Sequence, residues 1–380
     1  MKIKTITCQR AINHGANLQA YALMRYLESL GNDVEIIDYY PEWFKPFRPF
    51  YCGTQKYASN PFLKFSYICV KLPGRIKSYV KYIKSKRKKN FEAFRERYYK
   101  LTNTYNTFDE LKTNPPKADL YIAGSDQIWN TMMNNGKDPA YYLQFAPAGS
   151  MTATYAASFS VSEIPDELKE QIRKYIDNIN FVSLREKSAL AILEDLSIQN
   201  GCAVLDPVFL LDRKQWEELE NNIKLDDAYV LVYDFEGNEK VKRFAIEYAQ
   251  KHNLKVYSLY KNDYCDNSFE DYGPDVFLSL INNADFIVSN SFHATAFSLI
   301  YEKEFAVIKR QEGINSRMVD LLESVGINDR IVDSYQEFNA IDYNLVKDKL
   351  EVEVEKSKGY LNRVLESVIN NGEEKGSFCH

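Results

Sequence analysis

The sequence is poor in the features that mark a metal centre or a disulfide-stabilised fold. Its six cysteines have no CxxC spacing and stand at positions 8, 52, 69, 202, 265 and 379. Acidic residues do not cluster with any of the four histidines at ligand spacing. Zinc sites and disulfide frameworks need such spacings, so we expect no metal and no disulfides. The cysteine usage favours a protein of the reducing cytoplasm.

Long apolar segments are also missing. The first ten residues, MKIKTITCQR, lack the apolar core of a signal peptide. The nearest candidate for a membrane span, residues 62–70, is short and contains Lys64. We therefore expect a soluble protein or one peripheral to a membrane. The net charge of −5 gives no general attraction to nucleic acid, so an anionic ligand would need a local cluster of cations.

The length of 380 residues favours two domains. A strand at 3–8, a helix at 17–30 ended by Gly31 and a strand at 34–39 form a β-α-β unit, which predicts a parallel sheet. The same alternation continues along the chain. Further strands are predicted at 119–123, 152–157, 181–184, 202–205, 229–234, 255–259, 285–289 and 305–308. Further helices are predicted at 164–179, 186–196, 238–252, 274–283 and 343–370. We expect two α/β domains, 1–220 and 221–380, with a ligand cleft between them and a closing C-terminal helix.

Residues 41–110 form a predicted insertion in the first domain. The part from 41 to 73 is rich in aromatic residues and proline and shows no clear period, as expected of an irregular or lid-like segment. Residues 75–100 contain eleven Lys or Arg and two Glu, and predict an amphipathic basic helix or helix pair. The favoured interpretation is a solvated helix packed on the sheet. The alternative is peripheral contact with the inner face of a membrane, near a lipid-linked substrate.

His293 occupies the most informative position in the sequence. It follows the strand at 285–289, just after the plausible N-cap Ser291, and therefore lies in the first turn of a helix. Helix starts at the carboxyl ends of parallel strands favour phosphate or carboxylate groups. Three cations, Lys309, Arg310 and Arg317, follow shortly after. This pattern predicts a site for an anionic substrate; the alternative is a buried histidine with solvated cations nearby.

Seven segments follow one another in the order of a known family. They are NHGANLQAYAL (13–23), AGSDQIWN (123–130), YAASFS (155–160), FVSLRE (181–186), DPVFLL (206–211), SFHATAFSLIYEKEF (291–305) and NSRMVDLL (315–322). Together they resemble the polysaccharide pyruvyl transferase family. The resemblance implies a GT-B-like fold of two facing Rossmann-like domains with mainly parallel sheets. It also implies transfer of a pyruvyl group from phosphoenolpyruvate onto a sugar hydroxyl pair during the synthesis of bacterial cell-surface polysaccharide. The acceptor would be lipid-linked or nucleotide-linked, and no cofactor is expected beyond phosphoenolpyruvate as co-substrate.

The resemblance assigns the donor to the second domain. Phosphoenolpyruvate carries a phosphate and a carboxylate, so its site needs several cations. The candidates are Arg185, Lys309, Arg310, Arg317 and the neighbouring Ser291. Ketal formation also requires a proton on the enol carbon, and His293 is the candidate general acid.

The resemblance assigns the acceptor to the first domain. Asp126 is the candidate base, exposed by the turn that contains Ser125; the alternative is a helix N-cap. Trp129 would stack on the acceptor sugar or fill the core. The first β-α turn offers Asn13, Gly15 and Asn17 to acceptor hydroxyls, although Asn17 could be only a cap.

Two departures from the family pattern bear on the donor. Many members carry Arg-Leu-His where this chain has Ser-Phe-His at 291–293, so one cation is missing and either Arg310 or Arg317 replaces it or the donor differs. Ser160 stands where glycine is common.

Two other functions stay open. One is a GT-B glycosyltransferase that uses a nucleotide sugar, although the second half has no clear Gly-rich phosphate loop followed by an acidic residue. The other is a non-catalytic saccharide-binding protein.

Overall fold

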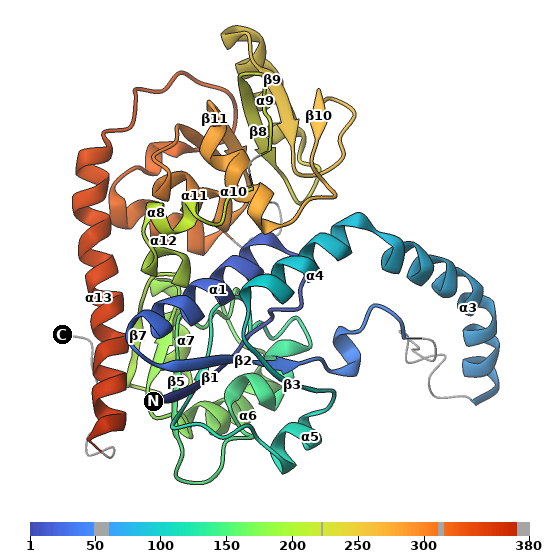
Figure 1. The fold of residues 1–380 in the computed structure, drawn as a ribbon, viewed down its shortest axis with the longest axis vertical. Coiled ribbons are helices and arrows are strands. Elements are labelled where there is room, and N and C mark those ends of the chain that lie inside the picture. The colour runs from blue at the N-terminus through green and yellow to red at the C-terminus, as the bar shows by residue number, and fades with distance from the viewer. Residues whose placement is uncertain (49–60, 222, 311–314, 371–380) are drawn as a thin grey trace.

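Two parallel sheets form the frame of the protein in the computed structural model, which describes residues 1–48, 61–221, 223–310 and 315–370 (Figure 1). The first sheet has the strand order β3-β2-β1-β4-β5 and the second β10-β9-β8-β11-β12-β13. The strands of the first sheet are β1 (Lys2–Ile6), β2 (Asp33–Tyr39), β3 (Leu101–Tyr105), β4 (Leu120–Ala123) and β5 (Met151–Thr154). Those of the second are β8 (Tyr229–Tyr233), β9 (Lys255–Ser258), β10 (Asn267–Ser268), β11 (Phe286–Ser289), β12 (Phe305–Ile308) and β13 (Ile331–Val332). The paired strands β6 (Val182–Leu184) and β7 (Gly201–Ala203) continue the first sheet through a bridge between Ala153 and Phe181.

Helices connect the strands, as the predicted alternation requires. They are α1 (His14–Ser29), α3 (Pro61–Lys84), α4 (Lys86–Tyr98), α5 (Phe108–Thr113), α6 (Asp166–Asp177), α7 (Leu190–Asp195), α8 (Arg213–Glu217), α9 (Glu239–His252), α10 (Pro274–Asn283), α11 (Phe292–Ile300), α12 (Ser316–Val325) and α13 (Tyr343–Ile369). The α/β class expected from the sequence is confirmed.

Helix α1 begins earlier than predicted. Asn13 is its N-cap, and its side-chain oxygen accepts a hydrogen bond from the backbone N–H of Ala16 at 3.0 Å. Gly31 follows the helix with a φ of 82°, the left-handed conformation that glycine adopts readily at a helix end. The first turn of α1, with His14 and Gly15, therefore points its free N–H groups toward the cleft side of the first sheet.

The segment around His293 folds as predicted. All four residues of β11 are buried, Ser291 caps α11 by accepting from the N–H of Ala294, and β12 follows. Nearly every residue of α11 is buried, because the helix packs between the second sheet and the first half of the chain.

A shared apolar core joins the two halves. Trp216 is fully buried, with its ring 5.9 Å from that of Tyr21 on α1 and 4.9 Å from that of Phe297 on α11. The C-terminal helix adds a second connection, because it returns to the first half (Figure 1). There the hydroxyl of Tyr360 donates to the backbone oxygen of Thr154 at 2.8 Å. The predicted closing helix thus packs on elements of both halves.

The insertion is more regular than the sequence suggested. Residues 61–73 were expected to be irregular, but they belong to α3, a helix of 24 residues that contains Pro73. Residues 49–60 lie outside the described part of the chain. The basic helix pair predicted from 75 onward is confirmed as the end of α3 followed by α4, with Ser85 as the N-cap between them. Helix α4 buries Phe91 and Phe94 against the body, whereas α3 projects away from it (Figure 1).

Candidate active site

Side chains from both halves meet where the parallel strands end. Ser125 and Asp126 follow β4, Arg185 follows β6, and Asp206 comes shortly after β7. The second half adds two residues, His293 from the first turn of α11 and Arg317 from α12. Of this set only Asp126 has a partly accessible side chain. The sequence predicted five of the six positions.

Asp206 is the centre of the cluster. Its Oδ2 accepts hydrogen bonds from Nη1 of Arg185 at 2.8 Å and from Oγ of Ser125 at 3.1 Å. Nε2 of His293 lies 3.6 Å from the same oxygen. Burial alone would raise the pKa of Asp206, but the neighbouring His293 and the charge and hydrogen bond of Arg185 hold that pKa well below its ordinary value. The carboxyl group is therefore a fixed anion that positions the arginine and faces the imidazole.

Gly15 sets the place of the imidazole ring. A Cβ atom built on Gly15 would overlap Nδ1 and Cγ of His293. The bare backbone of α1 therefore lies directly against one edge of the ring, while Nε2 on the other edge faces Asp206. The ring is held between a helix turn of the first half and a carboxylate.

We expect Gly15→Ala to lower turnover by about 10²-fold, because the added methyl group must displace the imidazole ring of His293 by an ångström or more. The fold should persist, since alanine is favoured over glycine in helices. Gly359→Ala on α13 is the matched control, because its new Cβ would meet only Nη1 of Arg363 at 3.5 Å. Steady-state kinetics on both variants measure the effect; equal rates would show that the ring position does not matter.

Two buried arginines lie close to the ring of Phe292. The guanidinium carbon of Arg185 is 5.0 Å from the ring centroid and that of Arg317 is 5.8 Å from it. Burial and then the positive charge of Arg185 lower the pKa of Arg317 to about 10. Four side-chain nitrogens of this cluster are buried and have no hydrogen-bond partner within the described part of the chain. They are Nε and Nη2 of Arg185, Nε of Arg317 and Nε2 of His293. Such an excess of buried donors fits an anion.

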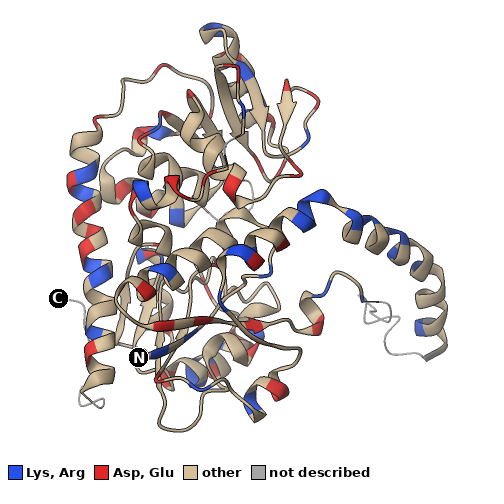
Figure 2. Cartoon of the chain, viewed as in Figure 1, with Lys and Arg blue, Asp and Glu red and all other residues tan. Residues whose placement is uncertain are grey.

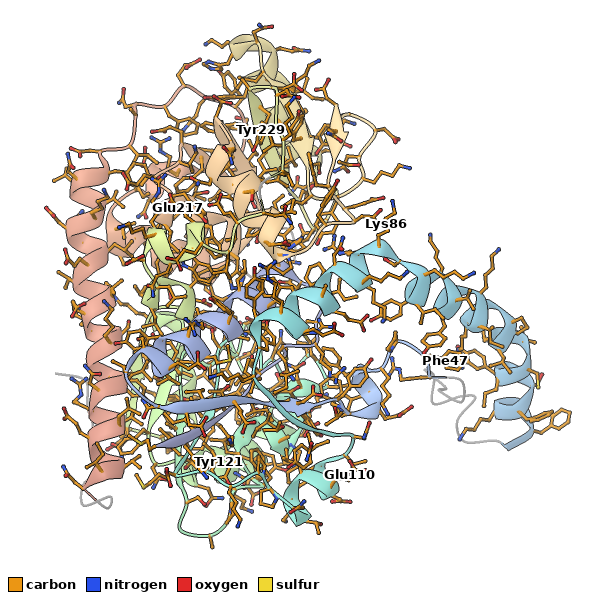
Figure 3. All side chains as sticks on the ribbon, viewed as in Figure 1. Phe47, Lys86, Glu110, Tyr121, Glu217 and Tyr229 are labelled. Atoms are coloured by element: carbon orange, nitrogen blue, oxygen red, sulfur yellow. The ribbon has the colours of Figure 1, made fainter. Side chains whose placement is uncertain are left out.

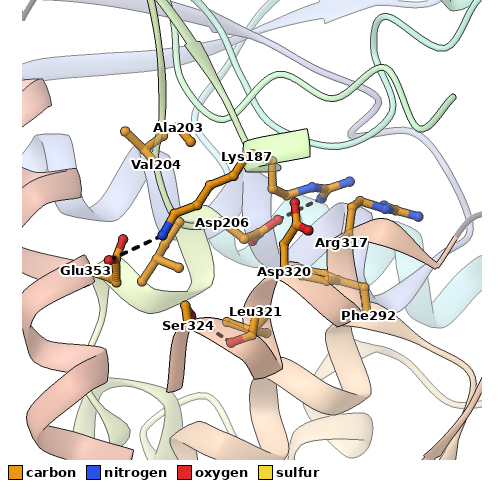
Figure 4. A pocket seen from close by; sticks show the side chains of 12 residues that line it. Lys187, Ala203, Val204, Asp206, Phe292, Arg317, Asp320, Leu321, Ser324 and Glu353 are labelled. Atoms are coloured by element: carbon orange, nitrogen blue, oxygen red, sulfur yellow. Dashed lines mark hydrogen bonds and ion pairs between the residues drawn. The ribbon is translucent and has the colours of Figure 1, made fainter. Parts of the chain in front are cut away.

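Beside these arginines lies a small pocket (Figure 4). Asp206, Phe292 and Arg317 line one end, and an ion pair between Lys187 and Glu353 lies at the other. Its volume is about 30 Å³. That is room for about two water molecules.

Asp126 connects the cluster to a larger pocket. Its Oδ1 lies 3.9 Å from Nη2 of Arg185, and its φ of 75° is left-handed, a conformation rare for residues other than glycine. No helix begins there, so the N-cap alternative is wrong. Asp126 also lines a pocket of about 450 Å³. Asn13 and the aromatic side chains of Trp43 and Phe44 line the same pocket.

The other donor candidates lie elsewhere. Lys309 is exposed after β12, and Nε of Arg310 donates to Oε1 of Glu236 at 2.9 Å. Neither lines the pocket beside Arg185, so the structure corrects the prediction that they join the cluster. Ser291 is buried and occupied as the N-cap of α11. Of the two cations that could replace the missing family arginine, Arg317 is the one that lies in the cluster, with its guanidinium carbon 5.8 Å from the ring centroid of Phe292.

Three acceptor candidates also require correction. Trp129 is fully buried, stacks on Tyr142 and donates to a backbone oxygen, so it fills the core and cannot stack on a sugar. The side-chain amide of Asn17 is bonded to the backbone oxygens of Ala11 and Asn13, and Asn17 is not the cap. Ser125 is fully buried in the ion cluster rather than exposed to an acceptor.

Ser160 keeps the backbone that a glycine would adopt. Its φ is 51°, and its N–H donates to Oε1 of the buried Glu186 at 3.2 Å. The departure from the family pattern at this position therefore leaves the local conformation left-handed.

Sequence reasoning missed Asp206 and Trp43. Asp206 is the first residue of the segment DPVFLL. Its place after a predicted strand and before Pro207 was the feature of the sequence that could have indicated a site residue. Trp43 belongs to the aromatic stretch after β2, where the sequence does not distinguish a pocket residue from a core residue.

Comparison with known proteins agrees with this geometry. A family model described as polysaccharide pyruvyl transferase matches residues 13–312. No curated protein matches the chain. A UDP-N-acetylglucosamine 2-epimerase from Rickettsia bellii is similar in structure, with 12% identity, a TM-score of 0.50 and 97% of each chain covered. A UDP-GlcNAc 2-epimerase from Methanocaldococcus jannaschii has 14% identity and a TM-score of 0.48, with 96% of this chain and 99% of that one covered. An E. coli heptosyltransferase has 9% identity and a TM-score of 0.38, with 93% of this chain and 99% of that one covered. At these identities the likeness concerns the fold alone, which is GT-B-like as predicted.

Proposed function

This chain belongs to the polysaccharide pyruvyl transferase family, and from that premise we propose that it transfers a pyruvyl group from phosphoenolpyruvate to a saccharide. The pyruvyl group becomes a ketal on two sugar hydroxyls, in the synthesis of a bacterial cell-surface polysaccharide. The observation that carries the proposal is the set of buried, unpartnered donors on Arg185, Arg317 and His293 among the described residues.

The donor suits this cluster because it is small and highly anionic. Its phosphate and carboxylate could take the free N–H groups of the two arginines, and each charge-assisted bond contributes roughly 1.5–3 kcal/mol. An anion would also relieve the repulsion that lowers the pKa of Arg317. Ser291 removes one cation relative to many family members, but Arg185 and Arg317 still supply two.

His293 and Asp126 divide the proton transfers. Protonated His293 gives its proton to C3 of the enol, and the resulting positive charge at C2 is attacked by a sugar hydroxyl whose proton passes to Asp126. The bond between C2 and the phosphate oxygen then breaks, and phosphate leaves. The second hydroxyl closes the ketal on C2, and its proton goes to the departing phosphate or to the histidine. Asp206 keeps the imidazole oriented throughout, because its carboxylate faces Nε2 at 3.6 Å.

The acceptor belongs in the larger pocket beside Asp126. Its volume of about 450 Å³ accommodates a sugar unit, and Trp43 and Phe44 offer flat apolar surfaces of the kind that sugar rings stack on. These two residues take the place that the sequence assigned to Trp129. Asn13, at the same pocket, remains a candidate for an acceptor hydroxyl.

Calorimetric titration with phosphoenolpyruvate tests the donor assignment. We expect binding, and we expect Arg317→Leu to weaken it by about 10- to 100-fold, since one charge-assisted contact is lost. The variant should be at least as stable as the wild type without ligand, because it removes one of two buried, mutually repelling cations. Arg310→Leu is the contrast: Arg310 bonds to Glu236 away from the cluster, so the affinity should be unchanged.

A uridine diphosphate sugar is the control ligand for this titration. Binding of phosphoenolpyruvate alone supports the proposed donor. Binding of the nucleotide sugar alone would contradict it and favour a glycosyltransferase.

A further inference from the structure

Helix α3 leaves an apolar stripe open to solvent. Phe62 is 77% exposed and Phe65 is 68% exposed. Three more exposed residues continue the stripe at helical spacing: Ile76, Val80 and Ile83. With about 100° of rotation per residue, all five point to one side of the helix. Exposed apolar patches of this kind mark interaction surfaces.

The same helix lies in a stretch of unmixed positive charge. Residues 61–91 contain ten Lys or Arg and no Asp or Glu, although the whole chain has a net charge of −5. Figure 2 shows Lys and Arg along α3 and α4 and no acidic residue on α3. Two lysines, Lys77 and Lys84, border the apolar stripe directly. Three more lie farther round the helix: Lys64, Lys71 and Lys81.

One flank of the stripe is held by the segment that carries the acceptor pocket. The rings of Tyr79 and Phe47 stack with their centroids 4.7 Å apart, and Figure 3 shows Phe47 facing the helix. A guanidinium nitrogen of Arg75 also donates to the backbone oxygen of Arg48 at 3.4 Å. The segment that ends in these contacts begins with Trp43 and Phe44, which line the 450 Å³ pocket. The flank of α3 that carries Arg75 and Tyr79 is therefore occupied, and the exposed residues of the stripe lie beside it.

We propose that α3 binds the surface of an anionic phospholipid bilayer. Phe62, Phe65 and Ile76 would enter the boundary between head groups and acyl chains, and the flanking lysines would meet lipid phosphates. The charge of α3 favours this occupant, because the helix carries Lys and Arg and no Asp or Glu, and these cations are the residues that bind phosphate groups. No described helix is long and apolar enough to cross a bilayer.

Membrane binding goes beyond the proposed function and does not depend on it. Its consequence for the acceptor does rest on that function. Because α3 contacts the segment at the rim of the acceptor pocket, a saccharide carried on a membrane lipid would approach the pocket from the bilayer side. This geometry favours a lipid-linked acceptor over a nucleotide-linked one.

Vesicle co-sedimentation with the full chain tests the proposal. We expect binding to phosphatidylcholine vesicles that contain phosphatidylglycerol, loss of binding at high salt, and little binding to phosphatidylcholine alone. Phe62→Ser with Phe65→Ser should weaken binding by about tenfold or more, as should Lys77→Glu with Lys81→Glu. Leu345→Ser with Val352→Ser is the matched control: these residues are also exposed, but they lie on α13, where acidic and basic residues are mixed. This pair should leave binding unchanged.

Three results would overturn the proposal. The first is a wild-type protein that does not bind the anionic vesicles. The second is equal binding by the α3 variants and the wild type. The third is self-association in sedimentation velocity that the α3 variants abolish, because a second copy would then cover the stripe. The calorimetric titration with phosphoenolpyruvate on the same variants should be unchanged, so a failure of membrane binding is distinguishable from a failure of the donor assignment.

Discussion

Replacing His293 by alanine is expected to lower kcat by about 10²- to 10⁴-fold, the range in which positioned general acids contribute. The ring lies between Gly15 and Asp206 with Nε2 unpartnered among the described residues, so its loss removes the proton donor without breaking a hydrogen bond of the fold. Phosphate released from phosphoenolpyruvate in the presence of the acceptor measures turnover. The affinity for phosphoenolpyruvate should fall far less than kcat, because both arginines remain.

His252→Ala is the matched control for this experiment. His252 lies at the end of α9, exposed and stacked on Tyr248, far along the chain from the cluster. It should keep full turnover. A His293→Ala protein that folds and retains the wild-type rate would show that another group protonates the enol carbon.

Asp206→Asn is expected to lower the free energy of unfolding by about 3 kcal/mol at neutral pH. The substitution removes the anion that pairs with the buried Arg185 at 2.8 Å, and breaking a buried ion pair costs about 3–5 kcal/mol. Urea unfolding followed by circular dichroism measures the loss. Inorganic phosphate should restore part of the stability, because it supplies the missing negative charge. Asp320→Asn is the control from the same pocket. Within the described part of the chain, Asp320 accepts hydrogen bonds from the backbone N–H and the hydroxyl of Ser188 alone, so the loss should stay below about 1 kcal/mol.

The pH dependence of this effect has a definite sign. The pKa of Asp206 is lower in the folded protein than in the unfolded chain, so its contribution is complete above the unfolded value of about 3.9 and is lost as the pH falls below it. The difference in stability between the wild type and Asp206→Asn should therefore shrink only below about pH 4. A difference that shrinks as the pH rises would contradict the ionised state of this carboxyl.

The sequence predicts the order of strands and helices well, because buried parallel strands are continuous apolar runs. Strand β12 and helix α10 have the predicted bounds, and β11 differs by one residue. Strand β3 was not predicted, since LTNTY has few apolar residues and lies at the edge of its sheet. Helix α12 was also missed, although Met318, Leu321, Leu322 and Val325 recur at helical spacing and are buried.

The site was predictable only where a residue type has one plausible role at a strand end. His293 and Arg185 were found in this way. The partner that organises them, Asp206, was missed, because a buried carboxylate is explained only by the cations that the fold brings to it. Trp129 and Trp43 show the same limit. Both are tryptophans near predicted strand ends, and only the packing decides which one lies in the core.

The return of α13 to the first half constrains how the molecule can move. The chain passes between the two sheets twice, once between β7 and β8 and once before α13, so any rotation of one half against the other must bend the backbone at both crossings. Arg185 and Asp206 move with one half, and His293 and Arg317 with the other. The pocket beside these residues is lined from both halves, by Arg185 and Asp206 on one side and by Phe292 and Arg317 on the other. A donor bound there as proposed would bridge cations of both halves, so its binding would favour the conformations in which the two halves hold these cations together.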